Sequence, residues 1–189
     1  MKKSEAFFLF LLFFWVVLAE AADYGFTIKN AKVNPADSGF VLDADIDYRF
    51  SHRSMDALKH GVPLTLVVKV RLSRYRGWIW NQSVFNKNLV YRLSYHALRK
   101  RYRVFDENSG IHQYHANLES ALRGMGKIRG LLVLSSAELV PDSRYIGKLM
   151  AYLDIEALPL PLRSVAFLVP QWYINSGWYT WTIDGLGRR

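Results

Sequence analysis

The chain has 189 residues, a formal net charge of +9 at pH 7 and no cysteine. The lack of cysteine excludes disulfides, cysteine nucleophiles and thiolate metal sites, so the stability of the fold must come from packing alone. The length fits a single domain that is large enough to bury a core without covalent cross-links.

The N-terminal segment has the pattern of a cleavable signal peptide. Lys2 and Lys3 precede an uncharged apolar run, Phe7 to Leu18, which leads into the small-x-small sequence Ala19-Glu20-Ala21. This run is shorter than the roughly 20 residues that span a bilayer, and no later apolar stretch approaches that length. We therefore expect a signal peptide over 1–21, a periplasmic location and no membrane span after cleavage. An uncleaved anchor is the alternative.

Alternation of apolar and polar side chains predicts a first β-hairpin. From Phe40 to Phe50 every second residue is apolar or aromatic, and most residues between them are charged. This period of two is typical of a half-buried antiparallel strand. Residues 24–33 are expected to form the preceding strand, with the turn residues of 34–39 between the two.

Further short strands and turns fill the middle of the chain. The turn residues Asp106 to Gly110 mark the clearest second hairpin. The expected strands cover 64–72, 78–85, 89–97, 99–105, 111–116, 131–140 and 144–155. The strand over 131–140 is mostly apolar, and the one over 144–155 alternates less cleanly than the others.

Two short helices interrupt this series of strands. One is expected over 55–60 with Ser54 as the N-cap and Gly61 at its end, and the other over 117–126. Many short strands separated by turn signals predict one all-β domain over 22–189. We expect an antiparallel β-sandwich, immunoglobulin-like in general architecture, with one or two short helices.

The positive charge is concentrated in one segment. Between Ala57 and Phe105 eleven residues are lysine or arginine and none is acidic. Such an asymmetry predicts a positive field that attracts an anionic partner, which for an exported protein is lipid, glycan or an acidic protein surface and not nucleic acid. The alternative is a solvated basic face that only keeps the domain soluble.

Arginines in this segment are candidate contacts for that partner. Arg99, Arg101 and Arg103 share one face if the chain is extended, and Arg71 lies on the polar side of the strand over 64–72. Guanidinium groups bind phosphate or carboxylate bidentately. Charged residues on an edge strand also discourage stray pairing, which explains the row of arginines equally well.

Patterns that would indicate a metal site are incomplete. His112 and His115 should point to opposite faces of a strand, so they could not share one metal unless the backbone bends. The spacing of Asp43, Asp45 and Asp47 resembles the start of a calcium loop, but the glycine and the final glutamate of such a loop are missing. We expect these three aspartates to lie opposite a basic strand, such as the one over 64–72.

The common catalytic and nucleotide-binding motifs do not occur in the sequence. We therefore expect no cofactor, no metal and no catalytic residues. A hydrolase of unknown type remains the less favoured alternative.

The closing stretch, Ala157 to Ile183, combines prolines with three tryptophans. Pro159 and Pro161 cannot donate to a sheet ladder, so the chain should leave the sheet there. Apolar residues between 162 and 169 are then expected to re-enter the core. Trp172, Trp178 and Trp181 cannot all face one way, so some should form a contact site while others pack in the core.

This closing pattern resembles a known family. Leu158 to Arg163 reads LPLPLR, and it is followed by Pro170, Trp172, Trp178, Tyr179 and Trp181. Together with the signal peptide and the all-β domain, the pattern is similar to that of the bacterial family called domain of unknown function 4390. The resemblance carries no assigned activity. Some members are encoded beside a membrane sensor histidine kinase and its response regulator, which implies an accessory role in envelope signalling.

We therefore expect a periplasmic binding or accessory protein. Its partner is an envelope protein, in particular a sensor kinase ectodomain, and the alternative is an anionic glycan or lipid. The candidate contact residues are Arg71, Arg99, Arg101, Arg103, Trp172, Trp178 and Trp181.

Overall fold

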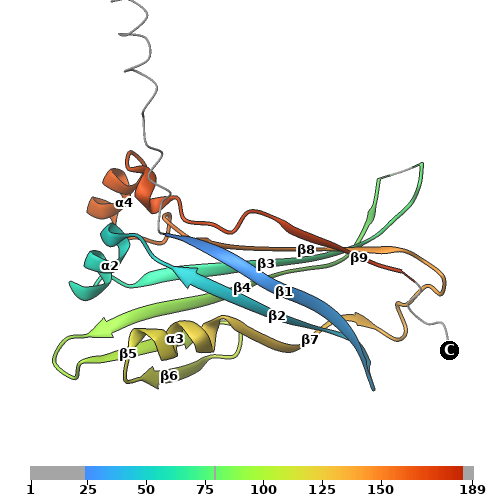
Figure 1. Ribbon diagram of the computed structural model, residues 1–189, viewed down its shortest axis with the longest axis horizontal. Coiled ribbons are helices and arrows are strands. Elements are labelled where there is room, and N and C mark those ends of the chain that lie inside the picture. The colour runs from blue at the N-terminus through green and yellow to red at the C-terminus, as the bar shows by residue number, and fades with distance from the viewer. Residues whose placement is uncertain (1–23, 79, 185–189) are drawn as a thin grey trace, which may run out of the picture.

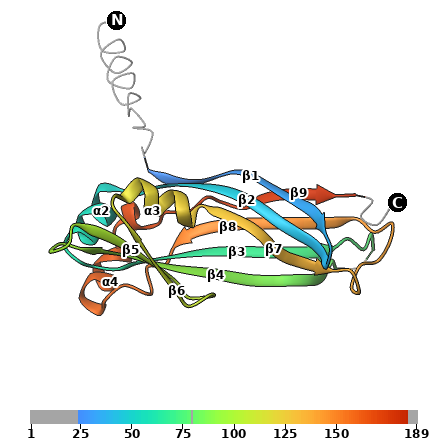
Figure 2. The same ribbon diagram turned by 90° about the horizontal axis from the view of Figure 1, so that it is seen from below.

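The computed structural model describes residues 24–78 and 80–184, and within them nine strands form two antiparallel sheets. The sheets face each other as a sandwich (Figure 1, and from below in Figure 2). The expected all-β antiparallel sandwich is confirmed. The small sheet has the order β1-β2-β7, and the large sheet has the order β6-β5-β4-β3-β8-β9.

The small sheet is built on the expected N-terminal hairpin. β1 (Gly25–Ala36) pairs with β2 (Gly39–Arg49), and β2 pairs on its other side with β7 (Lys127–Ser135). Every second side chain of β2 from Leu42 to Tyr48 is buried. The alternation of the sequence therefore selects the face that packs onto the core.

β7 lies earlier in the chain than the strand expected over 131–140. It ends at Ser135 because the backbone N–H of Glu138 donates back to the carbonyl of Ser135 and closes a turn. The apolar residues after this turn therefore lie outside the sheet.

The large sheet holds the remaining strands. They are β3 (Leu64–Arg74), β4 (Gln82–His96), β5 (Arg101–Asp106), β6 (Ile111–His115), β8 (Tyr145–Leu153) and β9 (Tyr179–Ile183). The two strands expected over 78–85 and 89–97 are one continuous strand, β4. Its polar middle, Asn86 to Asn88, stays in the sheet because it pairs with residues 69–71 of β3. The polar residues of this stretch do not favour a strand by themselves, and the pairing with β3 keeps them in one.

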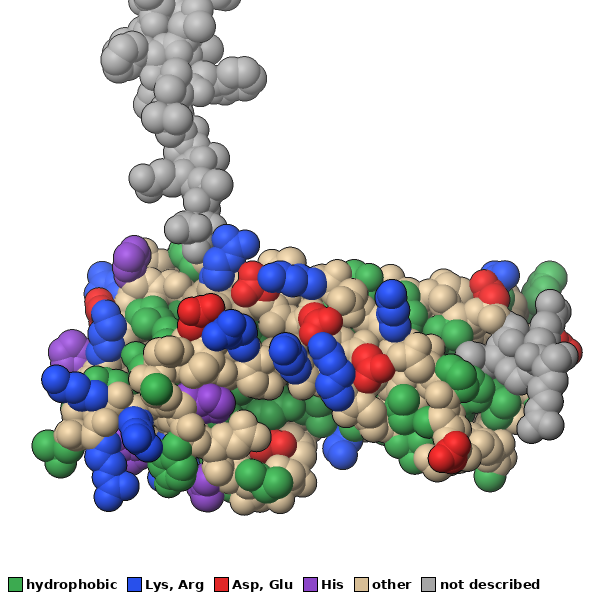
Figure 3. Space-filling view, turned by 60° about the horizontal axis from the view of Figure 1, so that its bottom comes forward, with side chains coloured by type: hydrophobic (Ala, Val, Ile, Leu, Met, Phe, Trp, Pro, Cys, Tyr) green, Lys and Arg blue, Asp and Glu red, His purple; other side chains and the backbone are tan. Residues whose placement is uncertain are grey.

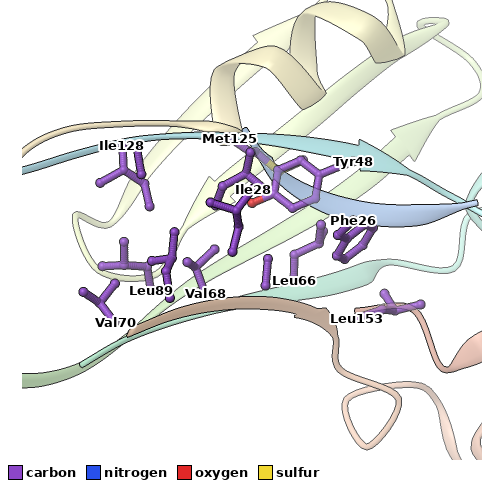
Figure 4. Close-up of a cluster of buried hydrophobic side chains, with 14 of the residues drawn as sticks. Phe26, Ile28, Tyr48, Leu66, Val68, Val70, Leu89, Met125, Ile128 and Leu153 are labelled. Carbon is purple, nitrogen blue, oxygen red and sulfur yellow. The ribbon is translucent and has the colours of Figure 1, made fainter. Parts of the chain in front are cut away.

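The core lies between the two sheets (Figure 4). Leu66, Val68 and Val70 of β3 face Phe26 and Ile28 of β1, and all five side chains are buried. Removing each such side chain from water stabilises the fold by about 1.5–3 kcal/mol. In this cysteine-free domain, the burial of apolar side chains supplies the stability that disulfides supply in many small domains.

α2 (His52–Lys59) connects the small sheet to the large one and starts earlier than expected. Its N-cap is Ser51 and not Ser54, because the side-chain oxygen of Ser51 accepts a hydrogen bond from the backbone N–H of Ser54. The hydroxyl of Ser54 is buried and donates to the carbonyl of Ser51. Both serines suit an N-cap chemically, so the sequence alone could not choose between them.

α3 (Leu118–Met125) confirms the second expected helix. Its N-cap, Asn117, accepts a hydrogen bond from the backbone N–H of Ser120 at 2.8 Å. Gly126 follows the helix, and its carbonyl accepts from the N–H of Ile46 at 2.8 Å. A Cβ atom at position 126 would lie 2.2 Å from the carbonyl oxygen of Ile46, so α3 can approach β2 this closely only with glycine there.

The segment after β8 forms a third short helix, α4 (Leu160–Ala166), and a 3₁₀ turn, η1 (Pro170–Trp172). The chain leaves the sheet before Pro159 as expected, but of the apolar residues between 162 and 169 only Leu162, Ala166 and Val169 pack in or against the core. Pro161 stands in the first turn, where its fixed φ favours a helix start. Ala166 at the end of this helix is buried, as is Leu158, which directly precedes the N-cap residue Pro159.

Other apolar side chains of this segment lie in water. Val165, Phe167 and Leu168 are exposed, as is Leu160 at the start of α4. No helix in the described part of the chain is long and apolar enough to cross a membrane. The expected signal peptide lies outside the described residues.

Candidate functional site

The large sheet turns one side toward the small sheet and the other side, called here the outer face, away from it. Arg71 pairs with Lys148 of β8, and Arg103 pairs with Ser94 of β4. Arg71 alternates along β3 with buried Val70, and paired residues point to the same side of a sheet. The structure therefore brings Arg71, Arg101 and Arg103 onto one outer face. Trp178 lies on the same face, because its ring contacts Arg71.

The outer face is basic across its whole width. In the strands that the structure describes, none of its positions holds an aspartate or glutamate. Its basic members are Lys69, Arg71, Arg92, Arg101, Arg103 and Lys148. β8 and β9 lie far along the chain from the basic segment, so strand pairing and not local sequence makes this face uniform. Of the six, Arg92 has a carboxylate partner, Glu107 in the β5–β6 turn, at 2.6 Å.

On the outer side of the small sheet, acidic side chains pair with basic or amide side chains of the same sheet. Asp45 accepts hydrogen bonds from Arg129 and, at 2.9 Å, from Asn30, while Asp47 lies 3.6 Å from Lys29. The hydrogen bond from Arg129 lowers the pKa of Asp45 below its usual value. The aspartates do lie opposite basic residues, since Asp43 pairs with Lys32 and Asp45 with Lys127, but these belong to β1 and β7 and not to the expected strand over 64–72.

Figure 3 shows the side of the molecule that carries the small sheet. Red and blue side chains alternate over the middle of the molecule, where the small sheet lies, whereas blue and purple side chains gather at the end near β5 and β6.

Three arginines converge on one hollow of about 800 Å³ at the β4–β5 end of the outer face. Its walls are His96, Arg99, Arg101, Arg103 and Tyr114. Among the described residues, no carboxylate forms an ion pair with any of these three arginines. Arg103 is held in place by its hydrogen bond to the hydroxyl of Ser94 at 3.3 Å. Guanidinium groups arranged around one hollow in this way have the chemistry to bind a phosphate or carboxylate group.

Aromatic rings hold two further cations at the other side of the outer face. The guanidinium of Arg71 lies 5.0 Å from the centre of the Trp178 ring, and the ammonium of Lys69 lies 4.8 Å from the centre of the Tyr152 ring. A cation above an aromatic face is attracted by the ring and loses freedom of movement. Lys69, Tyr152 and exposed Tyr173 border a second hollow of about 440 Å³.

The three candidate tryptophans have different environments. Trp172 is only 3% exposed and packs in the core, so the expectation that it contacts a partner needs correction. Trp181 lies on the inner side of β9, over Gly147. Trp178 is 43% exposed on the outer face and is the one of the three that can contact a partner.

Sequence reasoning missed Trp78 and Trp80. Both lie in the loop between β3 and β4 and are almost fully exposed, at 102% and 92%. We had expected a strand there. The turn residue Gly77, which directly precedes them, was the available signal of a loop.

The two histidines of β6 lie on opposite sides of the strand, as their spacing predicted. The His112 ring stacks on Phe105 at 4.4 Å between ring centres, whereas the His115 ring lies toward α3, where a Cβ atom at Gly124 would be 3.4 Å from it. Among the described residues, no three histidine or acidic side chains are placed to hold a metal ion.

Comparison with known proteins gave one match. The family model described as Domain of unknown function (DUF4390) matches residues 23–182, which is nearly all of the described chain. No curated protein and no solved structure matches the chain. The match covers the sandwich and the closing tryptophan segment that suggested the resemblance, and the chain therefore belongs to the DUF4390 family.

Proposed function

We propose that this protein is a non-catalytic accessory module of the periplasm that binds an acidic protein surface through its outer face. The observation that carries the proposal is the absence of acidic residues on the described outer-face strands beside six basic ones. Such a face produces a positive electrostatic potential, which increases the association rate of an anionic partner. A sensor kinase ectodomain with an acidic patch is the partner that fits the expected location.

The spread of the cations favours a broad partner over a small ligand. Arg101 on β5 and Trp178 beside β9 are separated by the strands β4, β3 and β8. With neighbouring strands about 4.8 Å apart, the face is about 20 Å wide. That width suits a protein interface of ordinary size, with an aromatic anchor at one side and arginines at the other.

A second candidate ligand is an anionic glycan or lipid head group. It is favoured by one observation, the convergence of Arg99, Arg101 and Arg103 on a single hollow. A compact phosphate or carboxylate could be held there by several guanidinium groups at once.

Photo-crosslinking in intact cells tests the proposal. A photoreactive residue is placed at Arg101 or Trp178, and as a control at Thr27, which is exposed on the outer side of the small sheet. We expect one protein adduct that recurs at Arg101 and Trp178 and is absent at Thr27. Adducts only to glycan or lipid would favour the second candidate, and no adduct at either position would overturn the proposal.

Charge reversal supplies the matched control. Arg101→Glu with Arg103→Glu should reduce the yield of the adduct at Trp178 at least tenfold. Lys32→Glu with Lys127→Glu makes the same change in net charge on the small sheet and should leave the yield unchanged. An equal effect of both pairs would mean that only the net charge matters and that the outer face is not the binding site.

A further inference from the structure

Exposed apolar side chains occur on two segments at the same end of the molecule. Leu160, the first residue of α4, is 72% exposed. Leu168, shortly after the helix, is 83% exposed, and Phe167 is also exposed. Leu98, at the tip of the β4–β5 turn, is fully exposed. Large apolar side chains held in water at the ends of rigid elements indicate a surface that something else covers.

These segments lie at one end of the sandwich. Gly25 pairs with Arg49, which leads into α2, and Leu93 of β4 pairs with Leu64 at the start of β3. α2 packs against η1, which directly follows α4. Figure 1 and Figure 2 both place α2, α4, the start of β1 and the β4–β5 turn at the same end. We call this the N-terminal end.

The apolar side chains of this end stand among basic ones. Arg99 and Lys100 follow Leu98 in the same turn, and Arg53 and Lys59 are exposed on α2. The exposed acidic side chains in these segments are Asp56 and Glu156. The balance is positive, which favours an anionic surface as the occupant and disfavours a second copy of the same end.

The start of the fold gives the second argument for the occupant. The chain before residue 24 joins the domain at this end, and it includes the apolar run Phe7 to Leu18. A segment of that composition is directed to the membrane during export. If this segment enters the membrane before it is cleaved, it brings the N-terminal end close to the bilayer surface.

We propose that the N-terminal end rests on an anionic phospholipid bilayer. Leu98, Leu160, Phe167 and Leu168 enter the interfacial layer, while Arg99 and Lys100 lie among the phosphate head groups. A few apolar side chains together with neighbouring basic ones supply the two signals that stable but reversible membrane contact needs. This inference does not depend on the acidic protein partner proposed above.

The proposal also fixes the orientation of the domain. β4 has 15 residues, which at about 3.3 Å per residue place its two ends about 50 Å apart. The loop with Trp78 and Trp80, next to the far end of β4, would therefore project away from the bilayer, and the long outer face would stand upright and open to a neighbouring protein.

The cysteine-free chain makes a site-specific test direct. Single cysteines are introduced as Leu98→Cys, Leu168→Cys and, as a control, Ala137→Cys in the turn after β7 at the opposite end. Each full-length variant is labelled with an environment-sensitive fluorophore. It is then mixed with phosphatidylcholine vesicles with or without phosphatidylglycerol, which also carry a lipid-attached quencher.

We expect blue-shifted emission and quenching at positions 98 and 168 with the anionic vesicles and neither at position 137. No response at positions 98 and 168, or an equal response at position 137, would overturn the proposal. A blue shift that rises with protein concentration in the absence of vesicles would instead identify a second copy as the occupant and would also overturn it.

A charge variant separates the anionic surface from apolar adsorption. Arg99→Glu with Lys100→Glu, made in the Leu168→Cys chain, should reduce the quenching severalfold, with an unchanged circular dichroism spectrum showing that the fold is intact. Quenching that is the same in this variant, or in vesicles without phosphatidylglycerol, would overturn the role of anionic lipid.

Discussion

The indole ring of Trp181 lies over Gly147, the residue directly opposite it on β8. A Cβ atom at position 147 would lie 2.3 Å from two carbons of that ring. Trp181 can therefore turn inward only because its neighbour has no side chain. This relationship assigns Trp181 a structural role on the inner side of β9, in contrast to Trp178 on the outer face.

Gly147→Ala is the direct test of this packing. The added methyl group must displace the indole or the strand, so we expect a loss of about 1–3 kcal/mol in the free energy of unfolding. Urea unfolding followed by tryptophan fluorescence measures it. Gly77→Ala is the control, since the nearest atom to its Cβ lies 4.0 Å away. Equal effects of the two substitutions would contradict the assignment.

Two buried tyrosines should respond in opposite directions to the loss of their hydroxyl groups. The Tyr48 hydroxyl is buried without a hydrogen-bond partner among the described residues, whereas that of Tyr145 accepts from the N–H of Val140 at 3.0 Å. Tyr48→Phe should therefore stabilise the protein by about 1 kcal/mol, and Tyr145→Phe should destabilise it by a similar amount. Thermal unfolding of the pair checks the sign, and a loss of stability in both would show that Tyr48 has an unseen partner.

Substitution of the tryptophans should separate packing from binding. Trp172→Ala removes a core side chain and should cost about 3–5 kcal/mol of unfolding free energy. Trp178→Ala removes a surface ring and should cost less than about 1 kcal/mol while it weakens partner capture. Urea unfolding and the adduct yield at Arg101 measure the two effects. A large stability loss for Trp178→Ala would contradict its placement as a contact residue.

Acid should weaken the pair between Asp45 and Arg129. The pKa of Asp45 is lowered in the folded chain by the hydrogen bond from Arg129, so the stabilisation is present above the ordinary carboxyl pKa of 3.8 and disappears as the pH falls through the lower folded pKa. The free energy of unfolding should therefore decrease between about pH 5 and pH 2. The decrease should be shallower in Asp45→Asn, and an identical pH profile in that variant would rule out a contribution from this pair.

Local patterns in the sequence determined much of the fold. The alternation from Phe40 to Phe50 predicted both the strand β2 and its buried face, because a period of two places successive side chains on opposite sides wherever the strand goes. The turn residues Asp106 to Gly110 located the β5–β6 hairpin for the same local reason. The closing LPLPLR and tryptophan pattern indicated the family, whose model matches residues 23–182.

The predictions were wrong where the local sequence is compatible with more than one structure. Ser51 and Ser54 both suit an N-cap, and residues 160–166 suit a strand or a short helix by composition. The tertiary structure decided both: Ser51 caps α2, and α4 buries Ala166 while Leu160 and Val165 remain exposed.

The sequence by itself determined that the protein is a cysteine-free, basic, all-β domain with its lysines and arginines concentrated between residues 57 and 105. Only the tertiary structure decided where that charge lies. Strand order placed β8 beside β3 and β9 beside β8, which brought Lys148 and Trp178 close to Arg71. It also placed Arg129 and Lys29, not Lys69, beside the aspartates of β2. Strand pairing joins residues far apart in the chain, and no local period encodes which strand becomes the neighbour of another.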